Sequence, residues 1–193
     1  FCIWIRSHYN AVRKVFKRLD TILTSIPLPE KIPVLPPRNP KASTAILMVN
    51  GFNGLGIHSL LGIIKTFPKQ YQNFVFVSVG VVDSSKFKGV DEIDLLREST
   101  ETALKKYVEF ANKLGFNAEY RLAIGTDAID ELDILCRNTV KEFPNSVCFT
   151  GRLIFEEENW ITRLLHNQAS FAIQRKLLFH GINMMVLPIR AIG

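Results

Sequence analysis

The chain has few cysteines and lacks the short motifs of several large enzyme classes. Its three cysteines, Cys2, Cys136 and Cys148, form no Cys-x-x-Cys pair and cannot all pair into disulfides, which favours a reducing compartment and argues against a structural zinc site. The sequence contains no Gly-x-x-x-x-Gly-Lys-Ser/Thr, no Gly-x-Ser-x-Gly and no His-Glu-x-x-His. We therefore expect no metal site and no enzymatic activity.

Acidic residues are scarce at the start of the chain. Residues 1–41 hold eight Lys or Arg and only two acids, which accounts for the whole net charge of +6. The rest of the chain carries 16 basic and 16 acidic side chains. Because that part is neutral, we expect no nucleic-acid binding by the folded domain.

A long apolar run is also missing from the N-terminus. Residues 1–5 are apolar but too short for a signal-peptide core, and a membrane span needs ~20 such residues. The chain does not begin with Met, so we expect a piece of a longer protein in which residues 1–5 end the last transmembrane helix.

Basic side chains follow this apolar segment at once. An aromatic residue before Lys and Arg is typical of the cytoplasmic membrane surface, where we expect contacts with anionic lipid headgroups from Trp4, Arg6, Arg13, Lys14, Lys17 and Arg18. The apolar residues Val12, Phe16, Leu19 and Leu23 equally fit an ordinary amphipathic helix. The two interpretations are compatible, and residues 1–25 are predicted to be a basic juxtamembrane helix.

Proline separates this helix from the rest of the chain. Residues 26–40 contain six prolines, which exclude a helix or an interior strand. Residues 26–41 are therefore predicted to be an extended linker, with a ligand role for an SH3-type domain as the weaker alternative.

Residues 42–193 alternate between apolar strand patterns and helical patterns. We predict strands over residues 45–49, 74–82, 117–124, 146–150 and 184–189, with helices over 57–67, 91–114, 128–140 and 160–179. Thr126 is the expected N-cap of the third helix, and residues 117–124 are expected to form an edge strand. Right-handed crossovers then give an α/β fold with a five-stranded, doubly wound parallel sheet of Rossmann-like type.

The glycine-rich turn at residues 50–56 follows the first strand. At such a position, backbone N–H groups and the helix dipole can meet a phosphate, although tight packing of helix and strand explains the glycines equally well. In the last helix, His166 and Asn167 form a polar cluster among apolar residues, which fits either a structural histidine or a ligand contact.

The domain resembles the universal stress protein family. The similarity lies in residues 120–129 (YRLAIGTDAI), in the closing strand at residues 181–190 and in the β-α-β order of the whole domain. ATP-binding members carry Gly-x-x-Gly, nine residues and Gly-Ser/Thr after the fourth strand, and an Asp after the first. Here Gly151 matches the first glycine, whereas Ile154 and Asn50 replace the second glycine and the Asp, and His166 and Asn167 occupy the Gly-Ser region.

The N-terminal segments sharpen the match. Together with the motifs NGFNGLGIH and LLHNQ, they look like the cytosolic C-terminal domain of bacterial permeases of the amino-acid/polyamine/organocation superfamily. This resemblance implies a non-catalytic regulatory or assembly domain on the cytoplasmic face of the inner membrane, attached to a transporter's transmembrane domain. The alternatives are a structural domain that dimerises through the edge of the fifth strand, without a ligand, and a stand-alone nucleotide-binding module.

A nucleotide such as AMP, ATP or cyclic di-AMP is the expected ligand, at the carboxyl ends of the first and fourth strands. In this hypothesis the glycines permit close approach and Arg152 neutralises phosphate charge. The candidate contacts are Asn50, Gly51, Asn53, Gly54, Gly80, Gly151, Arg152, His166 and Asn167.

Overall fold

The structure is a computed structural model that describes residues 29, 31–82, 90–154 and 160–190, with the side chains of 90, 91, 153–168 and 190 excepted. The predicted helix over residues 1–25 lies outside the described residues. So do its proposed lipid contacts, which are Trp4, Arg6, Arg13, Lys14, Lys17 and Arg18. The side chains of His166 and Asn167 also lie outside them.

Five parallel strands form one sheet in the order β3-β2-β1-β4-β5. Their bounds are β1 Thr44–Met48, β2 Asn73–Val81, β3 Asn117–Gly125, β4 Ser146–Ile154 and β5 Met184–Arg190. This order confirms the predicted α/β fold, with β3 as one edge and β5 as the other. The fourth strand is four residues longer than the predicted 146–150, because it stays paired with β5 as far as Ile154 and Arg190.

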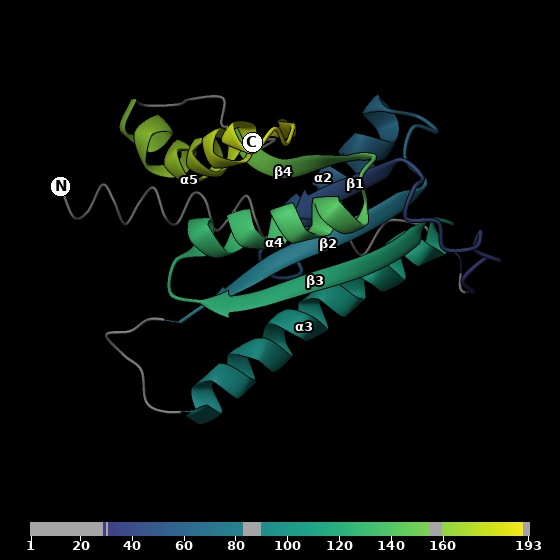
Figure 1. Cartoon of the computed structure of the whole chain (residues 1–193), viewed down its shortest axis with the longest axis horizontal. Helices are drawn as coiled ribbons and strands as arrows, with labels where there is room; N and C mark the ends of the chain where they lie inside the picture. Colours follow the sequence, from purple (N-terminus) through teal and green to yellow (C-terminus); the bar gives the residue numbers. More distant parts are fainter. Residues whose placement is uncertain (1–28, 30, 83–89, 155–159, 191–193) are drawn as a thin grey trace.

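Four helices of the described part of the chain cover the two faces of this sheet (Figure 1). They are α2 Gly54–Thr66, α3 Val90–Lys113, α4 Ala128–Glu142 and α5 Trp160–Phe179. One apolar core lies between the sheet and α2 and α3, and a second lies between the sheet and α4 and α5. The strands alternate between these cores, so that Leu47 of β1 points into the first and Ile46 into the second.

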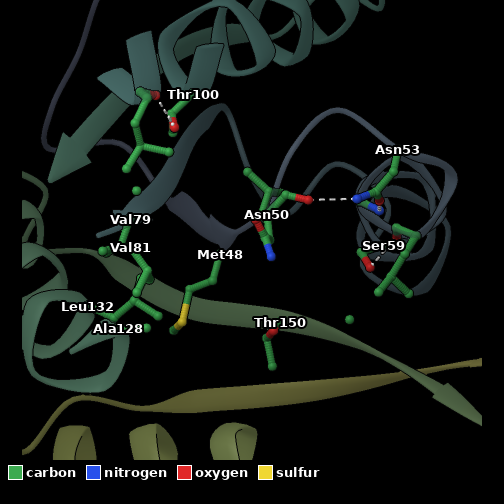
Figure 2. A pocket seen from close by; sticks show the side chains of 16 residues that line it. Met48, Asn50, Asn53, Ser59, Val79, Val81, Thr100, Ala128, Leu132 and Thr150 are labelled. Atoms are coloured by element: carbon green, nitrogen blue, oxygen red, sulfur yellow. Dashed lines mark hydrogen bonds between the residues drawn. The ribbon is translucent and has the colours of Figure 1, made fainter. Parts of the chain in front are cut away.

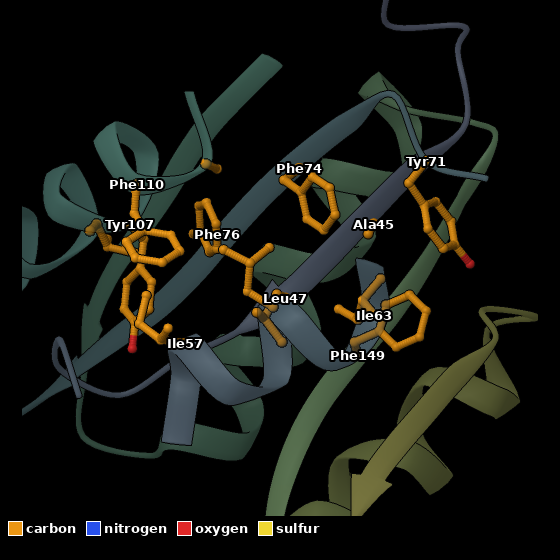
Figure 3. Close-up of a cluster of buried hydrophobic side chains, with 13 residues drawn as sticks. Ala45, Leu47, Ile57, Ile63, Tyr71, Phe74, Phe76, Tyr107, Phe110 and Phe149 are labelled. Carbon is orange, nitrogen blue, oxygen red and sulfur yellow. The ribbon is translucent and has the colours of Figure 1, made fainter. Parts of the chain in front are cut away.

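Aromatic side chains fill much of the first core (Figure 3). The Tyr107 ring of α3 stacks on Phe76 of β2 with 5.1 Å between ring centroids, and both residues are fully buried. Phe149 of β4 packs edge-on against Tyr71 at 5.6 Å. Burial of each large apolar side chain contributes ~1.5–3 kcal/mol, and these contacts hold α2 and α3 on the sheet.

Asx side chains set the starts of two helices and correct two predictions. Asn53 accepts a hydrogen bond from the Gly56 amide at 3.0 Å, so α2 begins at Gly54, three residues before the predicted start. The prediction of Thr126 as the N-cap of α4 is wrong, because the Asp127 carboxylate accepts hydrogen bonds from two helix amides, at 2.8 and 3.0 Å. Those bonds lower the pKa of Asp127 below its usual value.

The last residues of the predicted linker pack against the domain. Three asparagine side chains that flank the starts of strands donate to linker carbonyls: Asn117 to Pro36 at 2.7 Å, Asn73 to Asn39 at 2.8 Å and Asn145 to Lys41 at 2.7 Å. The chain therefore joins the domain at the amino-terminal ends of the strands, which is the right-hand end of the sheet in Figure 1.

An ion-pair cluster fixes the same part of the linker. Arg38 pairs with Glu119 of β3 and, at 2.5 Å, with Glu142 of α4, while Arg121 pairs with both glutamates. Both guanidinium groups lie over the Phe143 ring. Burial alone would raise the pKa of Glu119, but hydrogen bonds from the two arginines outweigh it and leave this pKa below its usual value. Hydrogen bonds from Arg121 and Arg38 likewise lower the pKa of Glu142.

Candidate nucleotide-binding cavity

A cavity of about 560 Å³ opens at the carboxyl ends of β1, β2 and β4 (Figure 2). It lies where the strand order reverses, since β2 and β4 flank β1 on opposite sides. Ligands of open α/β sheets bind at such switch points, and this volume is within the range of small-molecule sites.

The cavity has an apolar side and a polar side. Helices α3 and α4 and the ends of β1 and β2 supply the apolar side, with Met48, Val49, Val79, Val81, Leu96, Ala128 and Leu132. Polar groups come mostly from the β1–α2 turn, α2 and β4, with Asn50, Asn53, Ser59 and Thr150 (Figure 2). Among the described lining residues there is no charged side chain and no histidine or cysteine. This lining suits a flat, largely uncharged group with a few hydrogen-bonding atoms.

Tyr107 holds the polar turn in place from within the core. Its hydroxyl donates to the Gly51 carbonyl at 3.0 Å and accepts from the Asn53 amide at 3.3 Å. Asn53 also donates from Nδ2 to the Asn50 carbonyl at 2.7 Å. Gly51 has a φ of +66°, a conformation that glycine adopts without strain. The turn is therefore a preformed structure, fixed by side chains on both sides.

Close packing explains the glycines at the base of the cavity. A Cβ atom on Gly151 would collide with the Ser59 Oγ and lie 3.2 Å from the Ser59 Cβ, and a Cβ atom on Gly56 would overlap the Tyr107 ring. On Gly80 it would overlap Ile124 and lie 3.0 Å from the Leu96 Cγ. These glycines let α2 and α3 approach the strand ends, and so they shape the cavity wall.

Four of the nine candidate contacts line this cavity: Asn50, Asn53, Gly80 and Gly151. Gly51 and Gly54 lie in the adjoining turn and at the start of α2, but they are not part of the lining. The structure does not bring Arg152 to the cavity. Its side chain is on the same face of β4 as the lining residue Thr150, but two residues further along the strand, and its guanidinium lies 5.9 Å from the centre of the Phe171 ring of α5.

Sequence reasoning missed the part of the lining that comes from distant elements. Leu96 and Thr100 come from α3, and Ala128 and Leu132 from α4. In each pair the residues are four apart and therefore lie on one face of their helix, and this spacing is visible in the sequence. The sequence does not show that the two helix faces meet at the same cavity. Thr150 precedes the predicted contact Gly151 in β4, so the position of this strand was enough to predict that Thr150 lies near the cavity.

Two features are absent from the described residues. They contain no group of three or more His, Cys, Asp or Glu side chains arranged to hold a metal ion. No helix among them has both the length and the apolar character to cross a membrane. Burial lowers the pKa of His58 in α2, a histidine that does not line the cavity.

Comparison with known proteins shows a fold relationship. No protein-family model matches the chain, and no curated protein sequence matches it. A crystal structure of a protein from the universal stress protein family of Burkholderia pseudomallei matches with a TM-score of 0.51 at 17% sequence identity. The match covers 79% of this chain and 98% of that chain. The chain thus contains a universal stress protein-like α/β fold, as its sequence predicted, and the transporter context stays a prediction.

Proposed function

We propose that this domain binds an adenine nucleotide in the cavity at the ends of β1, β2 and β4. The observation that carries the proposal is the cavity itself, about 560 Å³ in volume, at the switch point of a doubly wound sheet. Its apolar side fits a purine base, and its polar side offers amide and hydroxyl groups to a ribose.

The lining favours a ligand with little charge. A triphosphate that leaves water needs compensating cations or many hydrogen-bond donors, and the described lining has no charged side chain. Adenosine or AMP, whose phosphate can stay in solvent at the mouth, fits better than ATP. Cyclic di-AMP carries two phosphates, so we expect its affinity to lie between that of AMP and that of ATP.

We also propose that the domain is a non-catalytic regulator of a membrane transporter in the same polypeptide. Acid-base or nucleophilic catalysis needs a titratable or nucleophilic group in the cavity, and the described lining offers only the hydroxyls of Ser59, Thr100 and Thr150. Each of the first two donates to a carbonyl of its own helix, at 2.7 Å. The basic N-terminal segment and the proline-rich linker support attachment to a membrane domain.

Calorimetric titration of the full chain with adenosine, AMP, cyclic di-AMP and ATP tests the ligand. We expect saturable binding that is tightest for adenosine or AMP. Ala128→Phe places a large ring in the cavity and should abolish binding, whereas Ala128→Ser changes the volume little and should preserve it. Arg152→Ala should leave the affinity unchanged, because the Arg152 side chain lies over Phe171. Absence of binding across the panel, or equal affinity in the Ala128→Phe variant, refutes the proposal.

The alternative of a dimer formed by pairing of β5 edges has less support. The Cys148 amide donates to the Asn183 carbonyl, so odd-numbered residues of β5 face β4 and even-numbered residues form the free edge. On that edge, Gln174 already donates to the Met184 carbonyl at 3.0 Å, and Pro188 has no N–H group. An edge with so few free groups is a poor template for another strand. A melting temperature that rises with protein concentration would favour the dimer instead.

A further inference from the structure

Apolar side chains gather on the outer face of α5 and at the start of β5. Phe171 is 50% exposed, Leu178 65%, Phe179 78% and Met185 42%. Phe171, Leu178 and Met185 also line a shallow groove of about 440 Å³ between α5 and β5. We call these four residues, with Arg175, the α5 patch. Large exposed aromatic and aliphatic side chains in one place are typical of an interaction surface.

The described charge at the α5 patch is positive. Residues 169–189, whose side chains the structure describes, contain Arg175 and Lys176 and no acid. Arg175 is exposed within the patch, and its guanidinium lies 5.8 Å from the centre of the Phe179 ring. Lys176, the next residue, points toward α4 and pairs with Asp130 there. The patch therefore joins exposed aromatic rings to an exposed cation.

Part of the α5 patch, Leu178, Phe179 and Met185, lies at the same end of the sheet as the linker attachment, and Phe171 lies further along α5 beside Arg152. Phe179 ends α5 just before β5 begins, and Met185 is the second residue of β5. The linker joins the domain at the amino-terminal ends of the strands, through Asn73, Asn117 and Asn145. The cavity lies at the opposite, carboxyl-terminal end. No residue of the α5 patch lines the cavity.

We propose that the α5 patch docks on an anionic lipid bilayer, with Phe171, Leu178 and Phe179 in the interface and Arg175 among the headgroups. The positive charge of Arg175 favours an anionic membrane over the other partners. A two-fold contact over the patch would bury two copies of the same cation in one interface, and the N-terminal segment carries the same sign of charge as the patch. Interfacial binding sites combine aromatic and aliphatic residues with Lys or Arg in this way. The inference does not depend on the ligand of the cavity.

Vesicle flotation of the full chain tests this surface. Arg13, Lys14, Lys17 and Arg18 are first replaced by alanine, so that the N-terminal segment contributes little. This protein should float with vesicles of phosphatidylserine and phosphatidylcholine, far less with phosphatidylcholine alone, and less at high salt.

Variants of the patch separate its apolar and charged parts. Phe179→Ser should lower the partition coefficient about tenfold, since burial of a Phe side chain is worth at least ~1.5 kcal/mol. Arg175→Glu should lower it at least about fivefold, since one cation near such a membrane is worth ~1 kcal/mol. Leu95→Ser, an equally exposed change on α3, and Lys65→Glu on α2 are the matched controls and should have little effect.

Three results would overturn the inference. The first is equal partitioning of the two patch variants and the controls. The second is absence of binding to phosphatidylserine vesicles. The third is a dimer in sedimentation equilibrium that Phe179→Ser dissociates, because the occupant of the patch is then a second copy. Arg175→Glu changes only an exposed side chain, so its result stands if Phe179→Ser lowers the melting temperature.

Discussion

Removal of the Tyr107 hydroxyl should destabilise the domain and loosen the turn beside the cavity. Tyr107→Phe keeps the ring, its stacking on Phe76 and its full burial, and removes the hydroxyl that bonds to Gly51 and Asn53. The Gly51 carbonyl loses a donor at 3.0 Å and the Asn53 amide loses an acceptor at 3.3 Å. Because both groups lie in a partly exposed turn that water can reach, we expect a loss of about 1–2 kcal/mol in unfolding free energy, or ~2–8 °C in melting temperature.

Urea unfolding followed by circular dichroism measures this loss. The m-value should not change, since the variant buries the same surface. Tyr71→Phe is the matched control: Tyr71 is almost as buried, and no hydrogen bond of its hydroxyl is found among the described residues. The control should cost less than ~0.5 kcal/mol. If the two variants lose equal stability, the Tyr107 hydroxyl does not hold the turn. If nucleotide binding is present in the parent, Tyr107→Phe should weaken it and Tyr71→Phe should not.

Two further predictions concern a glycine and the linker. Gly151→Ala should lower the unfolding free energy in thermal unfolding by about 1–3 kcal/mol, because the new Cβ collides with the Ser59 hydroxyl. Ser59→Ala in the same chain should restore most of this loss but not all of it, because the Cβ of residue 59 would remain only 3.2 Å away. If it restores nothing, another contact requires the glycine. The lowered pKa values of Glu119 and Glu142 stabilise the fold above the ordinary Glu pKa, and this contribution is lost as pH falls through the lower folded values. Arg38→Ala should therefore reduce the fall in unfolding free energy between neutral pH and about pH 3, and an unchanged pH profile would contradict the role given to the ion-pair cluster.

The order of strands and helices could be predicted because each has a strong local pattern. The apolar runs that became β1 and β2 admit little besides buried strands, and Gly115, with a φ of +89°, ends α3 where expected. The first residue of a helix was harder to predict. Thr126 and Asp127 are both residue types that favour the N-cap position, and the backbone conformation of the folded chain makes Asp127 the N-cap. The sequence analysis assigned Asn53 to a ligand, whereas in the structure its side-chain oxygen Oδ1 caps α2.

The cavity lies where the sequence analysis placed the nucleotide site, and four of the nine predicted contacts line it, while the nucleotide site itself stays a prediction. The parallel carboxyl ends of β1, β2 and β4 follow from the β-α-β order, and Asn50, Asn53, Gly80 and Gly151 come from these ends. The reason for Gly151 was not visible, because it depends on how Ser59 of α2 packs on β4. The two-residue period of β4 places Arg152 on the face of Cys148 and Thr150, but Thr150 lines the cavity, so only the contact with Phe171 of α5 shows that Arg152 does not.

Nuclear magnetic resonance of the full chain, labelled with nitrogen-15 and titrated with AMP, tests the central claim most directly. The account predicts saturable shifts in the amide signals of Asn50, Gly80, Ala128 and Gly151, with little change at Met185 and Asn117 on the opposite end of the sheet. Shifts centred on the α5 patch or the linker, or no shifts at millimolar AMP, would contradict a nucleotide site at the ends of β1, β2 and β4.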